Sequence, residues 1–348
     1  MNKILITGGS GFIGTNFIYY CLHRGYMIMN YDNLTYAGNK YNLQSINNNE
    51  NYTFVKGDIG NQDLLFDCFQ NFKPNYIVNF AAESHVDRSI DSPNNFIHTN
   101  ILGTYHLLES TLKYYNQDQD RKLKFLHIST DEVFGSLLDS ENPFNENSKY
   151  NPSSPYSASK ASSDHLVNAW IKTYHLPAII SNCSNNYGPY QYPEKLIPLM
   201  IQKCILEEEL PVYGDGKNIR DWIYVEDHCD ALLQILIKGK ITNHYLVGGN
   251  QEKTNLEVVE MICRILNELK PSDNLKSYFE LIRFVEDRPG HDYRYAIDCS
   301  KINEDLNWEP KINFENGIRK TITWYLVNKD WMNQIKKENH TLSKMDKK

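Results

Sequence analysis

Tyr156 and Lys160 stand one helical turn apart in the sequence, and such a pair could assist hydride transfer. Residues at i and i+4 share one face of a helix. A free tyrosine is a poor base because its pKa is about 10, but a lysine ammonium and a positive nicotinamide ring both favour the phenolate. Ser157, Ser159 and the hydroxyl donors at 129–130 argue against a chance surface match. The pattern predicts a tyrosine that takes a hydroxyl proton while the attached carbon loses hydride.

Two adjacent acids, Asp131 and Glu132, lie directly after a predicted strand. Adjacent side chains point in different directions, so the two carboxyls could reach different atoms of one substrate. Burial and like charge would raise at least one of the two pKa values, which keeps one acid protonated while the other stays an anion. An elimination needs such a pair, to take a carbon-bound proton and to protonate a leaving hydroxyl. Helix-capping or solvated loop acids are the alternative explanation.

A glycine-rich turn follows the first predicted strand and precedes the first predicted helix. Its glycines, Gly8, Gly11 and Gly14, have the spacing GxxGxxG. The first permits a tight turn, the second lets the backbone approach a pyrophosphate, and the third allows close contact between helix and strand. Free N–H groups at the helix N-terminus then face the phosphates. An ordinary flexible turn is the alternative, but the position between strand and helix favours a dinucleotide site.

Residues at the ends of the next strands extend the predicted cofactor site. Asp32 ends the second strand, where a carboxylate accepts hydrogen bonds from the adenosine ribose and repels a 2′-phosphate. Its neighbours Asn33 and Leu34 are not basic, so NAD is predicted rather than NADP. Asp58 could meet the adenine or cap a helix, and both readings stay open. The alanines at 81–82 leave room for a cofactor that lies against the backbone.

The first half of the chain alternates apolar runs with helix-length segments. Strands are predicted at 4–7, 27–31, 52–56, 76–80, 123–129 and 178–182, and helices at 12–24, 64–72, 96–115 and 155–174. Several strand runs are apolar almost throughout, as parallel strands covered on both faces are. The alternation predicts an α/β fold with a doubly wound parallel sheet of the Rossmann type.

After Asn185 the pattern is less regular and richer in proline and glycine. This change predicts a smaller α/β substrate-binding domain over residues 186–330, after a Rossmann domain over residues 1–185 to which later segments return. Further helices are predicted at 225–238, 255–269 and 314–331. Residues 332–348 are predicted to form a polar tail.

The composition is that of an ordinary globular protein, with 41% hydrophobic and 23% charged residues among 348. A net charge of −7 argues against nucleic acid as a partner. No apolar run approaches the ~20 residues of a membrane span, and the strand pattern from Lys3 leaves no room for a secretory signal. The seven cysteines are scattered without metal-ligand spacing. They predict reduced thiols in the cytoplasm and no metal site.

Longer motifs resemble a known family. The chain is similar to the dTDP-glucose 4,6-dehydratases, lyases of the extended short-chain dehydrogenase/reductase superfamily, from residue 3 to about residue 326. The motifs behind this resemblance are residues 7–14, 32–39, 81–89, 129–135, 156–160, 182–191, 193–198, 214–222 and 287–292.

The resemblance implies an internal oxidation and reduction of a sugar. Tyr156 takes the proton of the glucose 4-hydroxyl while C4 gives hydride to NAD, with Thr130 bonded to that oxygen and Lys160 on the nicotinamide ribose. Glu132 then removes the C5 hydrogen, and Asp131 protonates the leaving 6-hydroxyl. The hydride returns to C6 and C5 is reprotonated, so NAD is unchanged and is retained as a prosthetic group. The family also implies a homodimer through the predicted helices at 96–115 and 155–174.

Three sets of site residues follow from the motifs and the resemblance. The catalytic set is Thr130, Asp131, Glu132, Tyr156 and Lys160. The cofactor set is Gly8, Gly11, Phe12, Ile13, Gly14, Asp32, Asn33, Leu34, Thr35, Asp58, Ile59, Ala81, Ala82, Tyr156 and Lys160. The substrate set is Ser84, Thr130, Asn185, Glu194, Lys195, Leu196, Arg220, Asn255, Arg288 and His291. Arg220 and Lys195 suit a diphosphate because both form charge-assisted bonds to it. Structural ion pairs of Arg220 and Arg288 with Asp221 and Asp287 are the alternative.

Two residues depart from the family pattern. Phe134 replaces the usual tyrosine, and Tyr293 replaces an arginine near the nucleotide. The base, thymine or uracil, therefore stays open, and the same reaction on UDP-glucose is the nearest alternative. A nucleotide-sugar epimerase or decarboxylase would keep Tyr156 and Lys160 but would not need the acid pair. An NAD-sensing regulator on the same fold would typically lose the tyrosine or the lysine.

Overall fold

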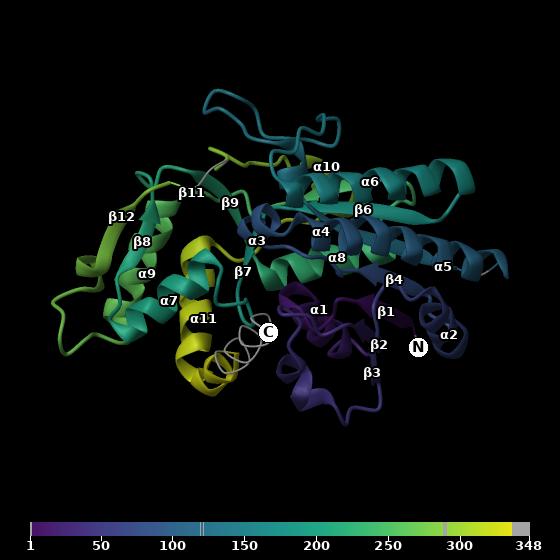
Figure 1. The fold of residues 1–348 in the computed structure, drawn as a ribbon, viewed down its shortest axis with the longest axis horizontal. Coiled ribbons are helices and arrows are strands. Elements are labelled where there is room, and N and C mark those ends of the chain that lie inside the picture. Colours follow the sequence, from purple (N-terminus) through teal and green to yellow (C-terminus); the bar gives the residue numbers. More distant parts are fainter. Residues whose placement is uncertain (1, 119, 121, 288–290, 336–348) are drawn as a thin grey trace.

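A seven-stranded parallel sheet forms the larger part of the computed structural model, which describes residues 2–118, 120, 122–287 and 291–335. The strand order is β10-β6-β5-β4-β1-β2-β3, and the labelled strands β6, β4, β1, β2 and β3 follow one another in this order in Figure 1. The strands are β1 Lys3–Thr7, β2 Met27–Asp32, β3 Tyr52–Lys56, β4 Tyr76–Asn79, β5 Lys124–Thr130, β6 Ala178–Cys183 and β10 His244–Val247. The order reverses between β1 and β4, which confirms the predicted doubly wound fold and opens a crevice at the carboxyl ends of the strands.

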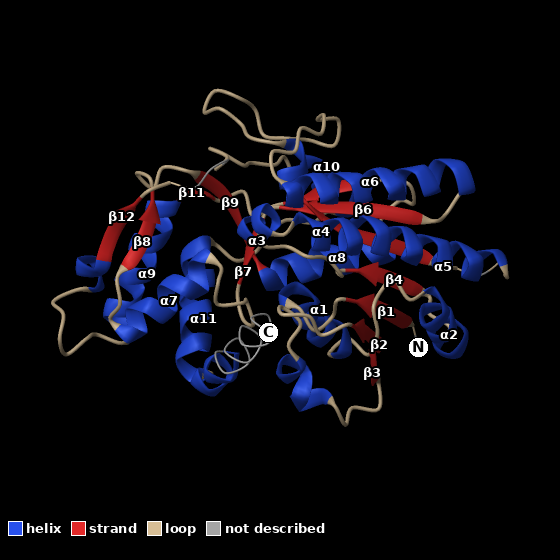
Figure 2. Cartoon of the chain, viewed as in Figure 1, coloured by secondary structure: helices blue, strands red, loops and turns tan. Residues whose placement is uncertain are grey.

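Helices cover both faces of this sheet (Figure 2). They are α1 Phe12–Leu22 and α8 Val225–Lys238 on one face, and α2 Gln62–Phe72, α5 Thr104–Asn116 and α6 Pro155–Tyr174 on the other. Alternation along β1 explains the two cores, because successive side chains point to opposite faces. Ile4 and Ile6 pack in the core with α1 and α8, whereas Leu5 packs in the core with α2, α5 and α6.

The remaining elements form a second lobe, drawn on the left of Figure 1. It contains a three-stranded sheet in the order β11-β9-β7 and a parallel pair, β12 and β8. Its elements are β7 Asn185–Tyr187, α7 Leu196–Leu206, β8 Leu210–Tyr213, β9 Ile219–Tyr224, β11 Glu252–Thr254, α9 Asn255–Leu269, β12 Ile282–Val285 and α11 Phe314–Val327. The later segments β10, α8 and α10 Ser300–Leu306 pack with the large sheet instead.

The predicted helix 96–115 is a composite. The short helices α3 Val86–Asp91 and α4 Pro93–Phe96 lead into a π-helical stretch, Ile97–Gly103, before α5 begins. A side chain at position 103 would lie 2.7 Å from the Ile59 side chain, so the wide turn brings the backbone close to the loop after β3. Single-turn π segments often occur at functional sites.

The prediction for the C-terminal segment needs correction. Helix α11 ends at Val327, because Asn328 leaves the helical conformation, and a further helical stretch covers residues 329–335. Met332 and Ile335 are buried with the core of the second lobe. The polar tail therefore does not begin at residue 332, and its remaining positions, 336–348, lie outside the described residues.

Candidate active site

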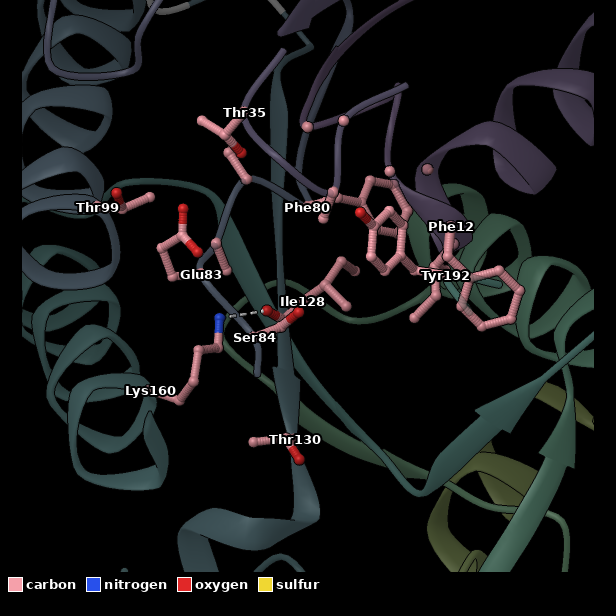
Figure 3. A pocket seen from close by; sticks show the side chains of 18 of the residues that line it. Phe12, Thr35, Phe80, Glu83, Ser84, Thr99, Ile128, Thr130, Lys160 and Tyr192 are labelled. Atoms are coloured by element: carbon pink, nitrogen blue, oxygen red, sulfur yellow. Dashed lines mark hydrogen bonds between the residues drawn. The ribbon is translucent and has the colours of Figure 1, made fainter. Parts of the chain in front are cut away.

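A cavity of about 330 Å³ lies at the carboxyl ends of the strands, where the sheet order reverses. It is lined by the β1–α1 turn, the ends of β2, β4 and β5, part of α6, and the segment from Cys183 to Lys195. Figure 3 places Phe12 and Tyr192 on one side of it, and Lys160, Glu83 and Thr99 on the other. The cavity is therefore assembled from segments that are far apart in the sequence.

The glycine turn has the backbone geometry that a close-fitting dinucleotide requires. Gly8 has φ +69°, and a side chain there would meet the Ala81 backbone nitrogen at 2.5 Å. A side chain on Gly14 would meet the Gly8 carbonyl oxygen at 2.5 Å. The same substitution at Gly11 would be milder, with that carbonyl oxygen at 3.3 Å. Only glycine fits positions 8 and 14 without movement of the backbone. The turn also leaves the start of α1 open to the cavity.

Asp32 lies at the cavity wall, as predicted, and orders the turn around it. Its two carboxylate oxygens accept hydrogen bonds from the backbone N–H groups of Ser10 (2.8 Å) and Leu34 (2.7 Å). Burial raises its pKa, and these two bonds oppose the rise. Asn33 and Thr35 also line the cavity, whereas Leu34 is not among the lining residues.

Asp58 lines the cavity and does not cap the following helix. The N-cap of α2 is Asn61, whose side chain accepts the Leu64 N–H at 3.1 Å. The Asp58 carboxylate instead accepts bonds from the Asn33 side chain at 2.9 Å and from the Gly60 N–H at 2.7 Å. The helix-cap alternative for Asp58 is therefore wrong.

The Tyr156–Lys160 pair is positioned by the start of α6. Ser154 and Ser157 form a reciprocal capping box there, and Pro155 occupies the first helical position. The Lys160 ammonium donates to the Ile128 carbonyl of β5 at 2.8 Å, the dashed line in Figure 3. Both side chains line the cavity. The predicted pair is thus brought to one side of the site.

Tyr156 does not ionise through the protein alone. Only 8% of the residue is exposed, and burial, together with the nearby Glu132 charge, raises the pKa of its phenol well above the ordinary value. A hydrogen bond with the Thr130 hydroxyl opposes this rise. Burial also lowers the pKa of Lys160. A phenolate at this position requires a further positive charge, which a bound nicotinamide ring would bring.

The adjacent acids differ in their surroundings, as the sequence suggested. Asp131 is 1% exposed, whereas Glu132 is partly exposed, and both line the cavity. One Asp131 oxygen accepts the Thr130 hydroxyl at 3.3 Å, and the other has no hydrogen-bond partner among the described residues. Burial raises the pKa of Asp131 well above its usual range, and the Glu132 and Asp221 charges add to the rise. Asp131 is therefore suited to remain a protonated acid beside an anionic Glu132.

Replacing Asp131 with asparagine is expected to stabilise the folded protein at neutral pH. Because the pKa of Asp131 is higher in the folded protein than in the unfolded chain, ionisation of this group opposes folding. The resulting loss of stability is absent below the pKa of Asp131 in the unfolded chain, about 4. It grows as the pH rises toward the pKa of Asp131 in the folded protein. In urea unfolding at pH 7, the variant should be more stable by about 1 kcal/mol, a typical effect of one substitution.

The same comparison at pH 4 is the internal control for Asp131→Asn. Any cost of the new amide is the same at both pH values, so only the ionisation effect changes between them. An equal stability difference at pH 4 and pH 7 would contradict the assignment of a buried, protonated acid.

The predicted substrate residues divide into two groups. Those that line the cavity are Ser84, Thr130, Asn185, Glu194 and Lys195. Those described elsewhere in the second lobe are Leu196, Arg220, Asn255 and His291, and Arg288 lies outside the described residues. The Arg220 guanidinium donates to the carbonyls of Ile219 and Asp292 and lies over the Tyr295 ring at 4.3 Å. A role for this second group stays a prediction.

Both departures from the family pattern have a structural context. Phe134 is buried against Phe144 and Tyr150, with ring centroids 5.2 and 5.1 Å away, so an apolar ring suits the position. The Tyr293 hydroxyl donates to the Asp139 carboxylate at 3.0 Å. Tyr293 therefore fastens the loop after β5.

Several cavity residues had no individual signal in the sequence. They are Tyr31, Phe80, Glu83, Thr99, Ile128 and Tyr192. Phe80 and Ile128 belong to strand ends, where a site was expected, so a systematic search of those ends could have found them. Thr99 lies in the π-helical stretch, which the sequence pattern did not distinguish from an ordinary helix.

The architecture and the Tyr156–Lys160 geometry identify a protein of the short-chain dehydrogenase/reductase type. The family described as GDP-mannose 4,6 dehydratase matches residues 5–321. A dTDP-glucose 4,6-dehydratase of Haemophilus influenzae is 53% identical over 334 residues, which are 94% of this chain and 99% of the relative. The chain belongs to this family of nucleotide-sugar dehydratases and, within it, to the dTDP-glucose 4,6-dehydratases.

Solved structures agree with this assignment. A Bacillus anthracis dTDP-glucose 4,6-dehydratase, crystallised in complex with NAD, superposes with a TM-score of 0.85 at 46% identity. The match covers 96% of this chain and 100% of the other. The Streptomyces venezuelae dTDP-glucose 4,6-dehydratase, also with NAD bound, has a TM-score of 0.85 at 39% identity, over 94% and 98% of the two chains. None of the helices in the described part of this chain could cross a membrane.

Proposed function

We propose that this chain is a lyase that removes water from dTDP-glucose and yields dTDP-4-keto-6-deoxyglucose, with NAD retained through the cycle. One observation carries the proposal: a single cavity contains both the Tyr156–Lys160 pair and the Asp131–Glu132 pair. The first pair suits oxidation of a hydroxyl, and the second suits elimination. Relatives named for this reaction, at about half identity over nearly the whole chain, support it.

The residues of the glycine turn and the strand ends fit NAD. Gly8, Gly11 and Gly14 with the start of α1 would receive the pyrophosphate, and Asp32 would receive the adenosine ribose. Lys160 would meet the other ribose. When bound, NAD supplies a hydride acceptor for the sugar C4 and a positive ring beside Tyr156.

The side chains then divide the proton transfers among them. Tyr156 takes the proton of the 4-hydroxyl, and the Thr130 hydroxyl forms a hydrogen bond with that oxygen. The partly exposed Glu132 takes the C5 proton, which the new 4-ketone has made acidic. Asp131, protonated by its burial, gives its proton to the departing 6-hydroxyl. After C6 regains its hydrogen, C5 is reprotonated, which completes the 4-keto-6-deoxy product. The burial of Asp131 and the partial exposure of Glu132 thus assign the two acids to opposite tasks.

Other nucleotide-sugar reactions on this fold are less well supported. An epimerase or a decarboxylase uses a tyrosine and a lysine but has no need of a buried, protonated Asp131. The choice of thymine over uracil rests on the relatives. The test is a competition between dTDP-glucose and UDP-glucose, scored as kcat/KM. A higher value for dTDP-glucose is expected, and turnover of UDP-glucose alone would redirect the assignment.

Substrate contacts are proposed at both groups of residues. Ser84, Asn185, Glu194 and Lys195 line the cavity and would meet the sugar and its phosphates. The remaining set, Leu196, Arg220, Asn255, Arg288 and His291, would meet the nucleotide. At this part of the cavity wall Glu194 pairs with Arg88 at 3.4 Å, and the Lys195 ammonium donates to the Ser84 carbonyl at 3.1 Å.

A homodimer in the cytoplasm is part of the same proposal. Ile97, Leu102, Tyr105 and Tyr174 are large, exposed side chains on or beside α5 and α6, the helices expected to meet in the dimer. All seven cysteines are buried free thiols, consistent with a reducing compartment. A mass measurement over a range of concentrations tests the dimer. The division into domains at residues 185 and 186 is likewise proposed.

A further inference from the structure

Asp164 is a fully buried carboxylate one helical turn beyond Lys160 on α6. One of its oxygens accepts three hydrogen bonds, from Ser129 at 2.8 Å, Tyr150 at 2.9 Å and Asn182 at 3.2 Å. These donors come from β5, a loop and β6, and none of them carries a positive charge. A buried anion with neutral donors is costly unless a cation lies nearby.

His127 is the first candidate for that cation, but its hydrogen bonds identify it as neutral. Its Nε2 lies 3.4 Å from the other Asp164 oxygen and 3.1 Å from the Ser163 hydroxyl, which itself donates to the Lys160 carbonyl. Nε2 must therefore donate. Nδ1 accepts from the Asn79 amide at 3.2 Å, because the Asn79 oxygen is occupied by Thr7. Burial, and then the Lys160 charge, lower the pKa of His127, and this lowering prevails over the opposite influence of Asp164.

Lys160 is the remaining cation beside Asp164. Its ammonium bonds to the Ile128 carbonyl, and the Asp164 carboxylate bonds to the adjacent Ser129 on the same strand. The two charged groups therefore bond to adjacent residues of β5, and the Lys160 charge is among the influences that lower the pKa of Asp164. Burial lowers the pKa of Lys160, and Asp164 is the strongest of the groups that oppose this. The other titratable groups around the pair are Tyr156 on α6, His127 on β5, Cys183 on β6, Tyr150 in the loop before α6, and His244 on β10.

We infer that Asp164 is a positioning residue of the active site, whose buried anion keeps Lys160 charged and fixed beside Tyr156. It is not among the residues that line the cavity, so it acts through Lys160 and not on the substrate. The consequence for catalysis rests on the proposed function. Without the Asp164 charge, Lys160 loses its proton at a lower pH, and the positive charge that favours the Tyr156 phenolate is then absent on the alkaline side.

The pH profile of turnover separates this role from a merely structural anchor. Asp164→Asn should narrow the profile from its alkaline side, with the alkaline limb about one pH unit lower and turnover about tenfold down beyond it, because Lys160 loses its proton there. Asp164→Glu should restore most of the width. Asp227→Asn is the matched control, because Asp227 is also a buried acid on a helix. Its carboxylate accepts hydrogen bonds from the backbone N–H groups of Lys311 and Ile312. If Asp164→Asn lowers turnover but leaves both limbs of the pH profile at their original pH, the inference is overturned.

A double-mutant cycle in stability tests the coupling between Asp164 and Lys160 without an activity measurement. Asp164→Asn and Lys160→Met each leave one buried charge unpaired, so each should lower the urea midpoint of the intact protein. The double variant should recover much of that loss, because neither charge remains. Additive losses would overturn the inference. If the protein does not turn over dTDP-glucose but the double variant clearly recovers stability, only the proposed function is overturned.

Discussion

Replacing Tyr156 with phenylalanine is expected to lower kcat for dTDP-glucose by about 10³-fold or more. The phenol oxygen is the proposed acceptor of the 4-hydroxyl proton, and the Thr130 hydroxyl beside it is a hydrogen-bond partner with no basic character of its own. The ring itself remains packed edge-on against Phe96, with centroids 6.3 Å apart, so the fold should be retained. Steady-state rates measured over a range of substrate concentrations separate the loss of kcat from a change in KM.

Tyr278→Phe is the matched control for this loss. Tyr278 is fully buried in the second lobe, and its hydroxyl donates to the Lys270 carbonyl at 2.8 Å. Its removal costs one buried hydrogen bond away from the cavity and should leave kcat nearly unchanged. A Tyr156→Phe enzyme that kept a tenth of its turnover would mean that another group accepts the proton.

Replacing Glu132 with glutamine should stop the reaction after oxidation of C4. An amide of the same shape cannot take the C5 proton, whereas Tyr156, Lys160 and Thr130 are unaltered. Overall product formation should fall by about 10³-fold. Exchange of the C5 hydrogen with deuterated solvent, followed by mass spectrometry of recovered sugar nucleotide, should fall equally.

The control for Glu132 is Glu146→Gln. Glu146 is a half-buried acid outside the cavity that accepts the Leu246 N–H at 3.2 Å. The substitution Glu146→Gln should alter the stability of the protein slightly and leave solvent exchange at C5 unchanged. Solvent exchange at C5 that continued unchanged in Glu132→Gln would remove Glu132 from its assigned role and leave the acid pair without its anionic member.

Local signals accounted for much of the framework. The helix α6 runs over Pro155–Tyr174, as the sequence predicted, because a proline and two capping serines fix its start. The glycine turn was recognisable because Gly8 needs a positive φ and Gly14 tolerates no side chain. In both cases the determining contacts lie within a short stretch of chain, where residue type and spacing record them.

Long-range contacts were harder to anticipate. Tyr150 and Asp164 look like unrelated polar residues until the loop before α6 folds back onto that helix. Asp58 and Asn61 are both plausible caps for α2, and only the backbone geometry selects Asn61. The unionised state of Tyr156 follows from its burial beside Glu132, which depends on tertiary packing. Such properties belong to the assembled site, so residue spacing alone does not contain them.

In the proposed cycle, hydrogen leaves C4 of the sugar ring and is delivered to C6 of the same molecule. dTDP-glucose that carries deuterium at C4, mixed with unlabelled substrate that carries a heavy-carbon tag, tests it by mass spectrometry of the product. The deuterium is predicted to appear in the C6 methyl group of untagged molecules alone. Appearance of the deuterium in the solvent, its transfer to tagged product, or its retention at C4 would rule out this internal transfer.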